Sequence, residues 1–249
     1  MTAATEGKAG PVLEGRGLVK RYGKLVVLDG VDFSVGPGEA LGIVGPNGAG
    51  KTTLLNVLAG SVTAEDGAVH LLGEQVTRLK PADRCHRGLG RAFQIPRPFA
   101  GMTVLENILV GASAGARLSR HELYSRCIDV SEVCGLSEIA NRRAGSLGLL
   151  HRKRLELARA LATDPRVLLL DEIGGGLTDA ETDDLVALIL QLRDQGIAIV
   201  WIEHIVHVLL RVATRLICMD AGKVIADGDP QAIMRDPAVV KAYLGGTVE

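Results

Sequence analysis

The chain has 249 residues, of which 47% are hydrophobic and 23% charged, so it holds enough apolar material for a folded core and is not a disordered chain. Its 28 Lys and Arg balance 29 Asp and Glu, and this near-neutral charge excludes the basic surface typical of nucleic-acid binding. No apolar run approaches the roughly 20 residues of a membrane-spanning helix, and the first ten residues lack the pattern of a secretory signal.

The four cysteines are typical of reduced thiols in an intracellular protein and do not form a metal-binding pattern. Cys85, Cys127, Cys134 and Cys218 are scattered, with no C-x-x-C spacing between any of them. We therefore expect reduced thiols rather than zinc ligands.

The first part of the chain is predicted to be rich in β-strands. Residues 1–10 are expected to form a flexible tail, and residues 12–44 contain short β-prone segments separated by Gly-Pro and Asp-Gly turns. Residues 51–58 are predicted to form a helix, and a turn at Glu65-Asp66-Gly67 leads into a strand over 68–73.

The rest of the chain changes from helical to alternating. Thr103 and Glu106 have the spacing of a capping box at the start of a helix, and two further helices are predicted over 118–134 and 152–161. After these, strands and helices alternate, at residues 166–171, 179–195, 197–202 and from 204 onward. This alternation predicts an α/β fold with a parallel sheet, into which the middle helices are inserted.

The most specific motif is a phosphate loop at residues 45–52, GPNGAGKT, which fits G-x-x-x-x-G-K-[ST] at every fixed position. It follows an apolar strand and precedes a helix, so backbone N–H groups and the helix N-terminus can face a phosphate; this context disfavours a chance glycine-rich turn. Lys51 would neutralise the β- and γ-phosphates, the Thr52 hydroxyl would bind Mg²⁺, and Thr53 would make a secondary phosphate contact. The predicted ATP-binding residues of this motif are Gly45, Pro46, Asn47, Gly48, Ala49, Gly50, Lys51, Thr52 and Thr53.

A pair of acids, Asp171 and Glu172, ends the apolar run VLLL. Asp171 is predicted to lie near the Mg²⁺, and Glu172 beside the γ-phosphate, where it could orient or deprotonate water. Adjacent residues on a strand point to opposite faces, so the two acids need different roles unless the strand has already ended. The alternative is an acidic strand end at an ordinary turn.

With Gln94 in GRAFQ, His204 in VWIEH and the run RKRLELARALATDPRVLLLDE, the chain resembles the nucleotide-binding subunits of ABC transporters from Leu13 to Gly245. The segments RAFQIPRPFAGMTVLENILVGA and RDPAVVKAYLG are similar to the ATPase subunits of branched-chain amino-acid importers, a subgroup that includes urea importers. The resemblance implies a P-loop NTPase fold with an N-terminal antiparallel β subdomain. It also implies an ATP-binding core over residues 11–94 and 163–245 and an α-helical signature subdomain over 95–162.

The resemblance also assigns three residues outside the two motifs. Tyr22 matches the aromatic residue that stacks on adenine, although a lone Tyr would as readily belong to the core. Gln94 matches the glutamine that meets Mg²⁺ and the attacking water, and His204 the histidine that contacts the γ-phosphate; the alternatives are a polar loop residue and a structural histidine. The implied catalytic residues are therefore Glu172, His204 and Gln94, and the implied metal ligands Thr52, Gln94 and Asp171.

The family's signature sequence, LSGGQ, is degenerate here. We align it with residues 147–151, LGLLH, because an alternative match at 145–149 would turn the following helix by roughly 200° and displace Leu155, Leu157 and Leu161 from their packing positions. Gly148 then lacks the signature hydroxyl and Leu150 is bulky where backbone must approach a phosphate. His151 could replace part of the lost hydrogen bonding, or the subgroup tolerates a loose signature.

The loop after Glu172 also departs from the family. It reads IGGGLT over residues 173–178, and its three glycines predict a mobile loop, whereas Thr178 keeps a hydroxyl for bonding across a dimer. We expect that the chain pairs with a second ATPase subunit, a different one or a copy of itself. The ATP site completed by this chain's signature would be the weaker one.

The expected function is ATP hydrolysis that drives import through separate membrane permeases, supplied indirectly by a solute-binding protein, at the cytoplasmic face of the membrane. A regulatory or weakly hydrolysing subunit is the alternative, and an ABC protein acting on ribosomes or DNA is disfavoured by the single phosphate loop and the neutral charge. An apolar groove between Phe93 and Glu106 is the predicted permease contact. It contains Pro96, Pro98, Phe99 and Met102.

Overall fold

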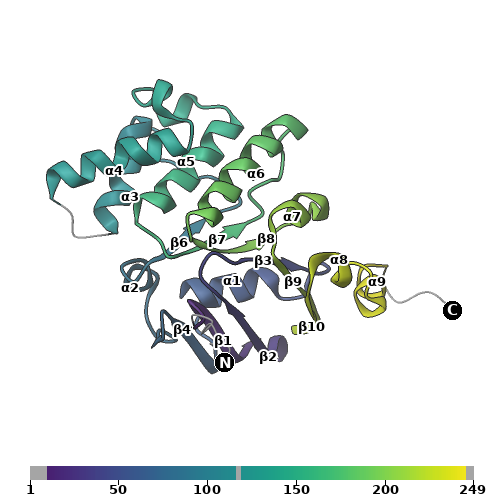
Figure 1. Cartoon of the computed structure of the whole chain (residues 1–249). Helices are drawn as coiled ribbons and strands as arrows, with labels where there is room; N and C mark the ends of the chain where they lie inside the picture. The colour runs from purple at the N-terminus through teal and green to yellow at the C-terminus, as the bar shows by residue number, and fades with distance from the viewer. Residues whose placement is uncertain (1–9, 116–118, 245–249) are drawn as a thin grey trace, which may run out of the picture.

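The computed structural model describes residues 10–115 and 119–244, so the predicted tail lies outside the described residues except for Gly10. Its centre is a six-stranded sheet in the order β10-β9-β3-β8-β7-β6, in which only the β9–β10 pair is antiparallel (Figure 1). The strands of this sheet are β3 (Ala40–Val44), β6 (Leu89–Ala92), β7 (Val167–Asp171), β8 (Ala198–Ile202), β9 (Arg215–Asp220) and β10 (Lys223–Gly228).

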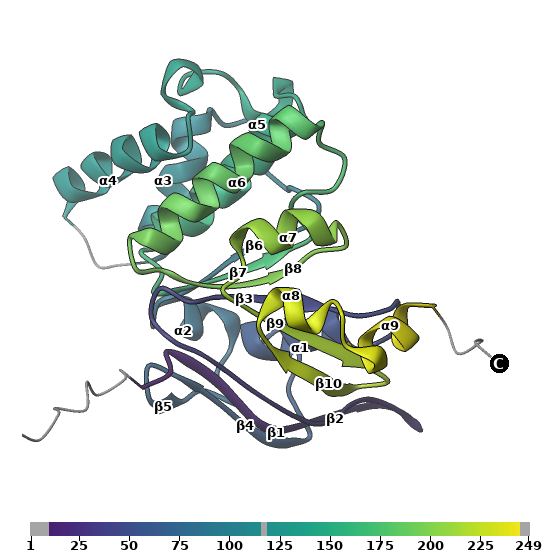
Figure 2. The same ribbon diagram turned by 45° about the vertical axis from the view of Figure 1, so that its right-hand side comes forward.

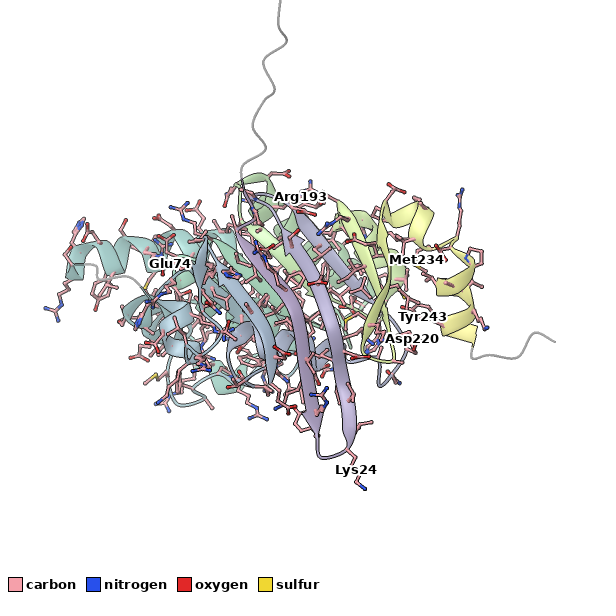
Figure 3. All side chains as sticks on the ribbon, turned by 90° about the horizontal axis from the view of Figure 1, so that it is seen from below. Lys24, Glu74, Arg193, Asp220, Met234 and Tyr243 are labelled. Carbon is pink, nitrogen blue, oxygen red and sulfur yellow. The ribbon has the colours of Figure 1, made fainter. Side chains whose placement is uncertain are left out.

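A second, antiparallel sheet lies below the first and has the order β2-β1-β4-β5 (Figure 2). It consists of β1 (Leu13–Tyr22), β2 (Leu25–Val35), β4 (Asp66–Leu71) and β5 (Glu74–Gln75). The hairpin of β1 and β2 extends beyond the rest of the sheet, with Lys24 at its tip (Figure 3). The expected α/β architecture with an N-terminal antiparallel β part is therefore confirmed.

Helix α1 (Lys51–Ala59) lies between the two sheets and buries Leu54, Leu55 and Leu58 completely. Its C-terminal end is closed by Arg84 of α2 (Pro81–Cys85). The Arg84 guanidinium donates to the carbonyl oxygens of Val57 at 2.7 Å and Leu58 at 2.6 Å, in the last turn of the helix, where carbonyl oxygens lack the N–H four residues on. Burial lowers the pKa of Arg84 to about 10, so it stays charged at neutral pH.

Helices cover the opposite face of the six-stranded sheet (Figures 1 and 2). They are α3 (Val104–Ala114), α4 (Arg120–Val133), α5 (Leu149–Ala162), α6 (Asp179–Asp194) and α7 (Val206–Val212), and α8 (Pro230–Ile233) and α9 (Pro237–Leu244) follow β10. Short 3₁₀ turns lie at Ser137–Ile139 and Ala144–Ser146. The predicted capping box on α3 is present, with the Glu106 carboxylate accepting from the Thr103 N–H at 2.7 Å.

Both faces of the central sheet are buried, which explains its continuous apolar strands. In β7, Leu168 and Leu170 face the helical layer, whereas Val167 and Leu169 pack on the side of α1. The predicted elements are found at nearly their expected positions, but α5 begins at Leu149, three residues earlier than expected. The boundaries of the helical subdomain over 95–162 stay a prediction.

Candidate functional site

A cavity of about 190 Å³ lies where β3 ends and α1 begins. It is lined by residues 47–53 of the chain, by Val27 of β2, and by Glu172 and His204 from the next two strand ends. The N-terminus of α1 therefore opens on a space that also receives an acid and a histidine. Such a helix end favours a bound anion.

Lys51, the first residue of α1, is held in place by the main chain of the phosphate loop. Its ammonium donates to the carbonyl oxygens of Gly45 at 2.7 Å and Pro46 at 3.0 Å, and only 6% of the residue is exposed. Burial lowers the pKa of Lys51, and the negative charge of Glu172 opposes this shift. A cation that is desolvated in this way gains strongly from a nearby anion.

Glu172 is the centre of the site. Strand β7 ends at Asp171, and Glu172 has a positive φ of 47°, a conformation that is uncommon outside glycine and recurs at functional positions. Its carboxylate accepts a hydrogen bond from the Gln94 amide, and Oε1 lies 2.6 Å from Nε2 of His204. The structure thus brings together the three residues that the resemblance assigns to catalysis, from the ends of β6, β7 and β8.

A buried acid, Glu203, supports this cluster and was not anticipated from the sequence. One of its oxygens accepts from the His204 N–H at 2.9 Å and the other from the Gly174 N–H at 3.0 Å. A side chain at position 174 would place its Cβ 2.9 Å from the Glu203 carboxylate, so a larger residue there would force that carboxylate to shift. The sequence signal was an acid at the end of an otherwise apolar strand.

The loop after Glu172 is held by hydrogen bonds, contrary to the mobile loop expected from its glycines. Besides the Gly174 contact, the buried Lys153 of α5 donates to the Ile173 carbonyl at 2.8 Å. The Thr178 hydroxyl, expected to bond across a dimer, caps α6 and lies 3.0 Å from the Glu181 carboxylate. The hydrogen bonds from the Thr178 backbone N–H and hydroxyl lower the pKa of Glu181, and His151 makes a smaller electrostatic contribution.

Asp171 is paired with Arg91 of β6, a second residue that sequence reasoning missed. The Arg91 guanidinium lies 2.9 Å from Asp171 Oδ2, donates to Asn56 of α1 at 2.8 Å and stacks on the Phe93 ring at 4.5 Å. The side chains of Asp171 and Arg91 are each only 10% exposed. The other Asp171 oxygen has no hydrogen-bond donor among the described residues, and its predicted role as a metal ligand stays a prediction.

Comparisons with known proteins decide the family. A family model described as "ABC transporter" matches residues 28–174, and one described as "Branched-chain amino acid ATP-binding cassette transporter" matches residues 223–249. The chain belongs to the ABC transporter family. It is similar to the high-affinity branched-chain amino acid transport ATP-binding protein BraF of Pseudomonas aeruginosa, at 37% identity over 94% of this chain and 98% of BraF.

Two further relatives agree with this assignment. LivG of Escherichia coli, also a branched-chain amino acid transport ATP-binding protein, is 35% identical over 94% of this chain and 98% of its own length. The crystal structure of a nucleotide-free ABC-transporter ATP-binding cassette superposes with a TM-score of 0.87 at 33% identity, covering 95% of this chain and all of that one. The chain is thus an ATP-binding cassette and an ATPase of the ABC type, as the resemblance implied.

The remaining predicted ABC residues lie at the edge of the cavity or outside its lining. Thr52 and Thr53 line it. Tyr22, at the end of β1, does not; it is 51% exposed, which excludes the alternative of a core residue. Its contact with adenine stays a prediction.

The signature segment, residues 147–151, lies at the start of α5. Gly148 is the N-cap of that helix and provides no side-chain hydrogen bond. Leu155, Leu157 and Leu161 are buried, and the alignment of the signature with residues 147–151 stays a prediction. Leu149 is 45% exposed beside Gly176 of the loop after Glu172. Under the alignment with residues 147–151, Gly148 stands where the family signature has a hydroxyl. Leu149 places an exposed apolar side chain where the signature has a glycine.

A larger cavity, of about 320 Å³, is lined by Phe93 and by none of the residues that line the ATP cavity. Its walls come from α2, β6, α3 and α5, and include Arg91, Arg159 and Glu156. It shares Phe93 with the groove expected between Phe93 and Glu106, in which Phe99 and Met102 are also exposed, at 45% and 39%, with Arg159 5.0 Å from the Phe99 ring. The permease contact at that groove stays a prediction. Within residues 10–115 and 119–244, no helix is long and apolar enough to cross a membrane.

Proposed function

We propose that the chain is the ATP-hydrolysing subunit of an importer for branched-chain amino acids. The cluster of Gln94, Glu172 and His204 beside the phosphate loop carries the hydrolytic part of this proposal. The transported solute is supported by the names of BraF and LivG and by the match of residues 223–249. Urea, carried by related importers, is the competing solute.

In this proposal the phosphate loop binds ATP and Glu172 activates water. Lys51 exchanges its two carbonyl contacts for the β- and γ-phosphates, and Thr53 adds a further phosphate contact. Glu172 accepts a proton from the water that attacks the γ-phosphate, while Gln94 and His204, both hydrogen-bonded to it, orient that water and the phosphate. Tyr22 stacks on adenine from the edge of the β-sheet.

Mg²⁺ fits the donors at this site. Magnesium in nucleotide sites is usually held by one or two carboxylates, the phosphates and water. Asp171 supplies a carboxylate with one free oxygen, Thr52 a hydroxyl and Gln94 an amide oxygen. The metal, when bound, would neutralise charge on the phosphates.

Two kinds of partner complete the proposed transporter. A second ATPase subunit, paired head to tail, would bring its signature to this chain's phosphate loop, and a different subunit fits best because this chain's own signature lacks a hydroxyl. Membrane permeases would dock in the 320 Å³ cavity, whose wall includes Phe93 next to Gln94, so the chain would lie at the cytoplasmic face of the membrane. A solute-binding protein would act only through the permeases.

A weakly hydrolysing subunit is the second candidate, favoured by the exposed Leu149 and the uncapped start of α5. The two are separated by measuring ATP turnover of the assembled transporter in lipid vesicles, with solute-binding protein loaded with leucine or urea. We expect turnover that leucine stimulates and that is lost in Glu172→Gln. Stimulation by urea alone would contradict the solute, and turnover insensitive to Glu172→Gln would favour the weakly hydrolysing subunit.

A further inference from the structure

The C-terminal segment carries none of the predicted site residues, yet one face of its last helix reaches the phosphate loop. Asp236 directly precedes α9, and its carboxylate accepts from the Ala238 N–H at 2.7 Å. Val239, only 1% exposed, anchors the helix in the same core cluster as Ile233 and Cys218. The position of α9 on the molecule is therefore fixed by burial.

Tyr243 lies one helical turn after Val239 and on the same face of α9. Figure 3 shows it near Asp220, at the end of β9. Its hydroxyl accepts a hydrogen bond from the backbone N–H of Gly45 at 2.9 Å, across 198 residues of sequence. Gly45 is the first residue of the phosphate loop, directly after β3 ends.

Gly45 is the point at which the loop turns away from the sheet. Its φ is 146°, and a side chain there would place its Cβ 2.1 Å from the Met219 carbonyl oxygen. Its N–H is bound by Tyr243 and its carbonyl by the Lys51 ammonium. The conformation of this one residue is thus fixed by the C-terminal helix on one side and by the phosphate-binding lysine on the other.

A second contact comes from the same side of the molecule. The N–H of Gly222, in the turn between β9 and β10, donates to the Ala49 carbonyl at 3.1 Å, and the Gly222 carbonyl accepts from Asp29 at 2.9 Å. The C-terminal part of the chain therefore contacts the backbone of the phosphate loop at two residues, Gly45 and Ala49.

We propose that α9 latches the phosphate loop and that Tyr243 is a positioning residue, which makes the C-terminal segment a determinant of nucleotide affinity. This inference rests on the proposed ATP site. Tyr243 has no contact with Glu172, Gln94 or His204, so it acts on binding rather than on the chemical step. Burial raises the pKa of the Tyr243 hydroxyl, so the phenol stays neutral at pH 7.

The first test uses the nucleotide-free full-length chain and the variant Tyr243→Phe. We expect faster backbone hydrogen exchange in the peptide that covers residues 41–50, because the Gly45 N–H loses its acceptor. Tyr124→Phe on α4, whose ring is also partly exposed, is the matched control and should leave that peptide unchanged. Unchanged exchange at residues 41–50 in Tyr243→Phe would overturn the proposal.

The second test measures ADP binding by titration calorimetry. Loss of one hydrogen bond to the loop should weaken ADP about two- to ten-fold in Tyr243→Phe, with turnover of the assembled transporter at saturating ATP changed less than about two-fold. A lower turnover with unchanged ADP affinity would also overturn the proposal. If the unmodified chain bound no nucleotide, the proposed function would fail, whereas the exchange result would still decide whether the latch exists.

Discussion

Two regions of the molecule are predicted to face ATP in an ABC dimer, the phosphate loop and the signature segment, and they differ in the polar side chains they offer. At the phosphate-loop end, Lys51, Glu172 and His204 line one cavity, and buried partners hold them in place. At the signature end, Gly148 offers no side-chain oxygen and Leu149 is exposed. In a head-to-tail pair each chain contributes its phosphate loop to one ATP site and its signature to the other. With a different partner that carries an intact signature, we expect a strong site at this chain's phosphate loop and a weak site at its signature, whereas two copies of this chain would form two equal sites.

The two ends are also connected within the chain. Lys153, in the helix that begins at the signature, donates to the carbonyl of Ile173, next to Glu172. A displacement of α5 would therefore reach the residue next to Glu172 through a single hydrogen bond. The comparison can be tested at each end separately and at this link.

The largest effect is expected for Glu172→Gln in this subunit of the assembled transporter. Loss of the general base should lower ATP turnover about 10²- to 10⁴-fold if this chain's phosphate loop forms the strong site. Glu74→Gln, an exposed acid on β5, is the control and should change little. Turnover that survives Glu172→Gln would place the strong site on the partner's phosphate loop and reverse the comparison.

Removal of the Arg91 guanidinium in Arg91→Leu should destabilise the fold by about 3 kcal/mol, because Asp171 is left as an uncompensated buried charge. Urea unfolding of the isolated chain measures this loss. The exposed pair of Arg87 and Glu74 provides a matched control, and Arg87→Leu should cost less than about 1 kcal/mol. Equal losses of unfolding free energy in the two variants would show that the buried pair of Arg91 and Asp171 contributes no more to stability than the exposed pair.

At the weak end, Gly148→Ser should restore a hydroxyl without a clash, since no atom lies within 4 Å of the Cβ it would add. In a transporter that already carries Glu172→Gln, we expect the residual turnover to rise about ten-fold, which is less than the roughly 10²- to 10³-fold contributed by a single preorganised donor in other enzymes. Gly10→Ser, also in open space, is the control. No increase would mean that Leu150, not the missing hydroxyl, limits this site.

The smallest effect is expected at the link between the ends. Lys153→Met keeps the length of the side chain but removes the donor to Ile173, which should cost about 1 kcal/mol of stability and speed hydrogen exchange in residues 173–178. Exchange in β8, which Lys153 does not contact, serves as the internal reference. If both regions changed equally, the effect would be global unfolding rather than loss of the link.

The sequence predicted the parts of the site that depend on local spacing. The phosphate loop and the acids at the end of β7 are contiguous motifs, and their strand and helix context can be read from neighbouring residues. Gln94 and His204 were found only through the resemblance, because each is a single polar residue at the end of a strand. The capping role of Thr178 was missed, although Glu181 stands three residues later.

Other supporting residues depend on tertiary placement, and the local sequence does not show which partner each of them meets. Arg91 meets Asp171 only because β6 and β7 are neighbours in the sheet, and Glu203 meets Gly174 across two strand ends. Tyr243 contacts Gly45 from the opposite end of the chain. Pattern reasoning therefore located the groups predicted to touch ATP and missed those that hold them.

The guanidinium of Arg84 at the end of α1 has an electrostatic consequence for the whole nucleotide site. The peptide dipoles of a helix place partial positive charge at its N-terminus and partial negative charge at its C-terminus. Here the negative pole is neutralised by a buried cation, whereas the positive pole opens on the ATP cavity. The positive potential at the N-terminus of α1 is therefore only weakly opposed by the negative potential at its C-terminus. This strengthens the attraction of the helix for anions in the cavity.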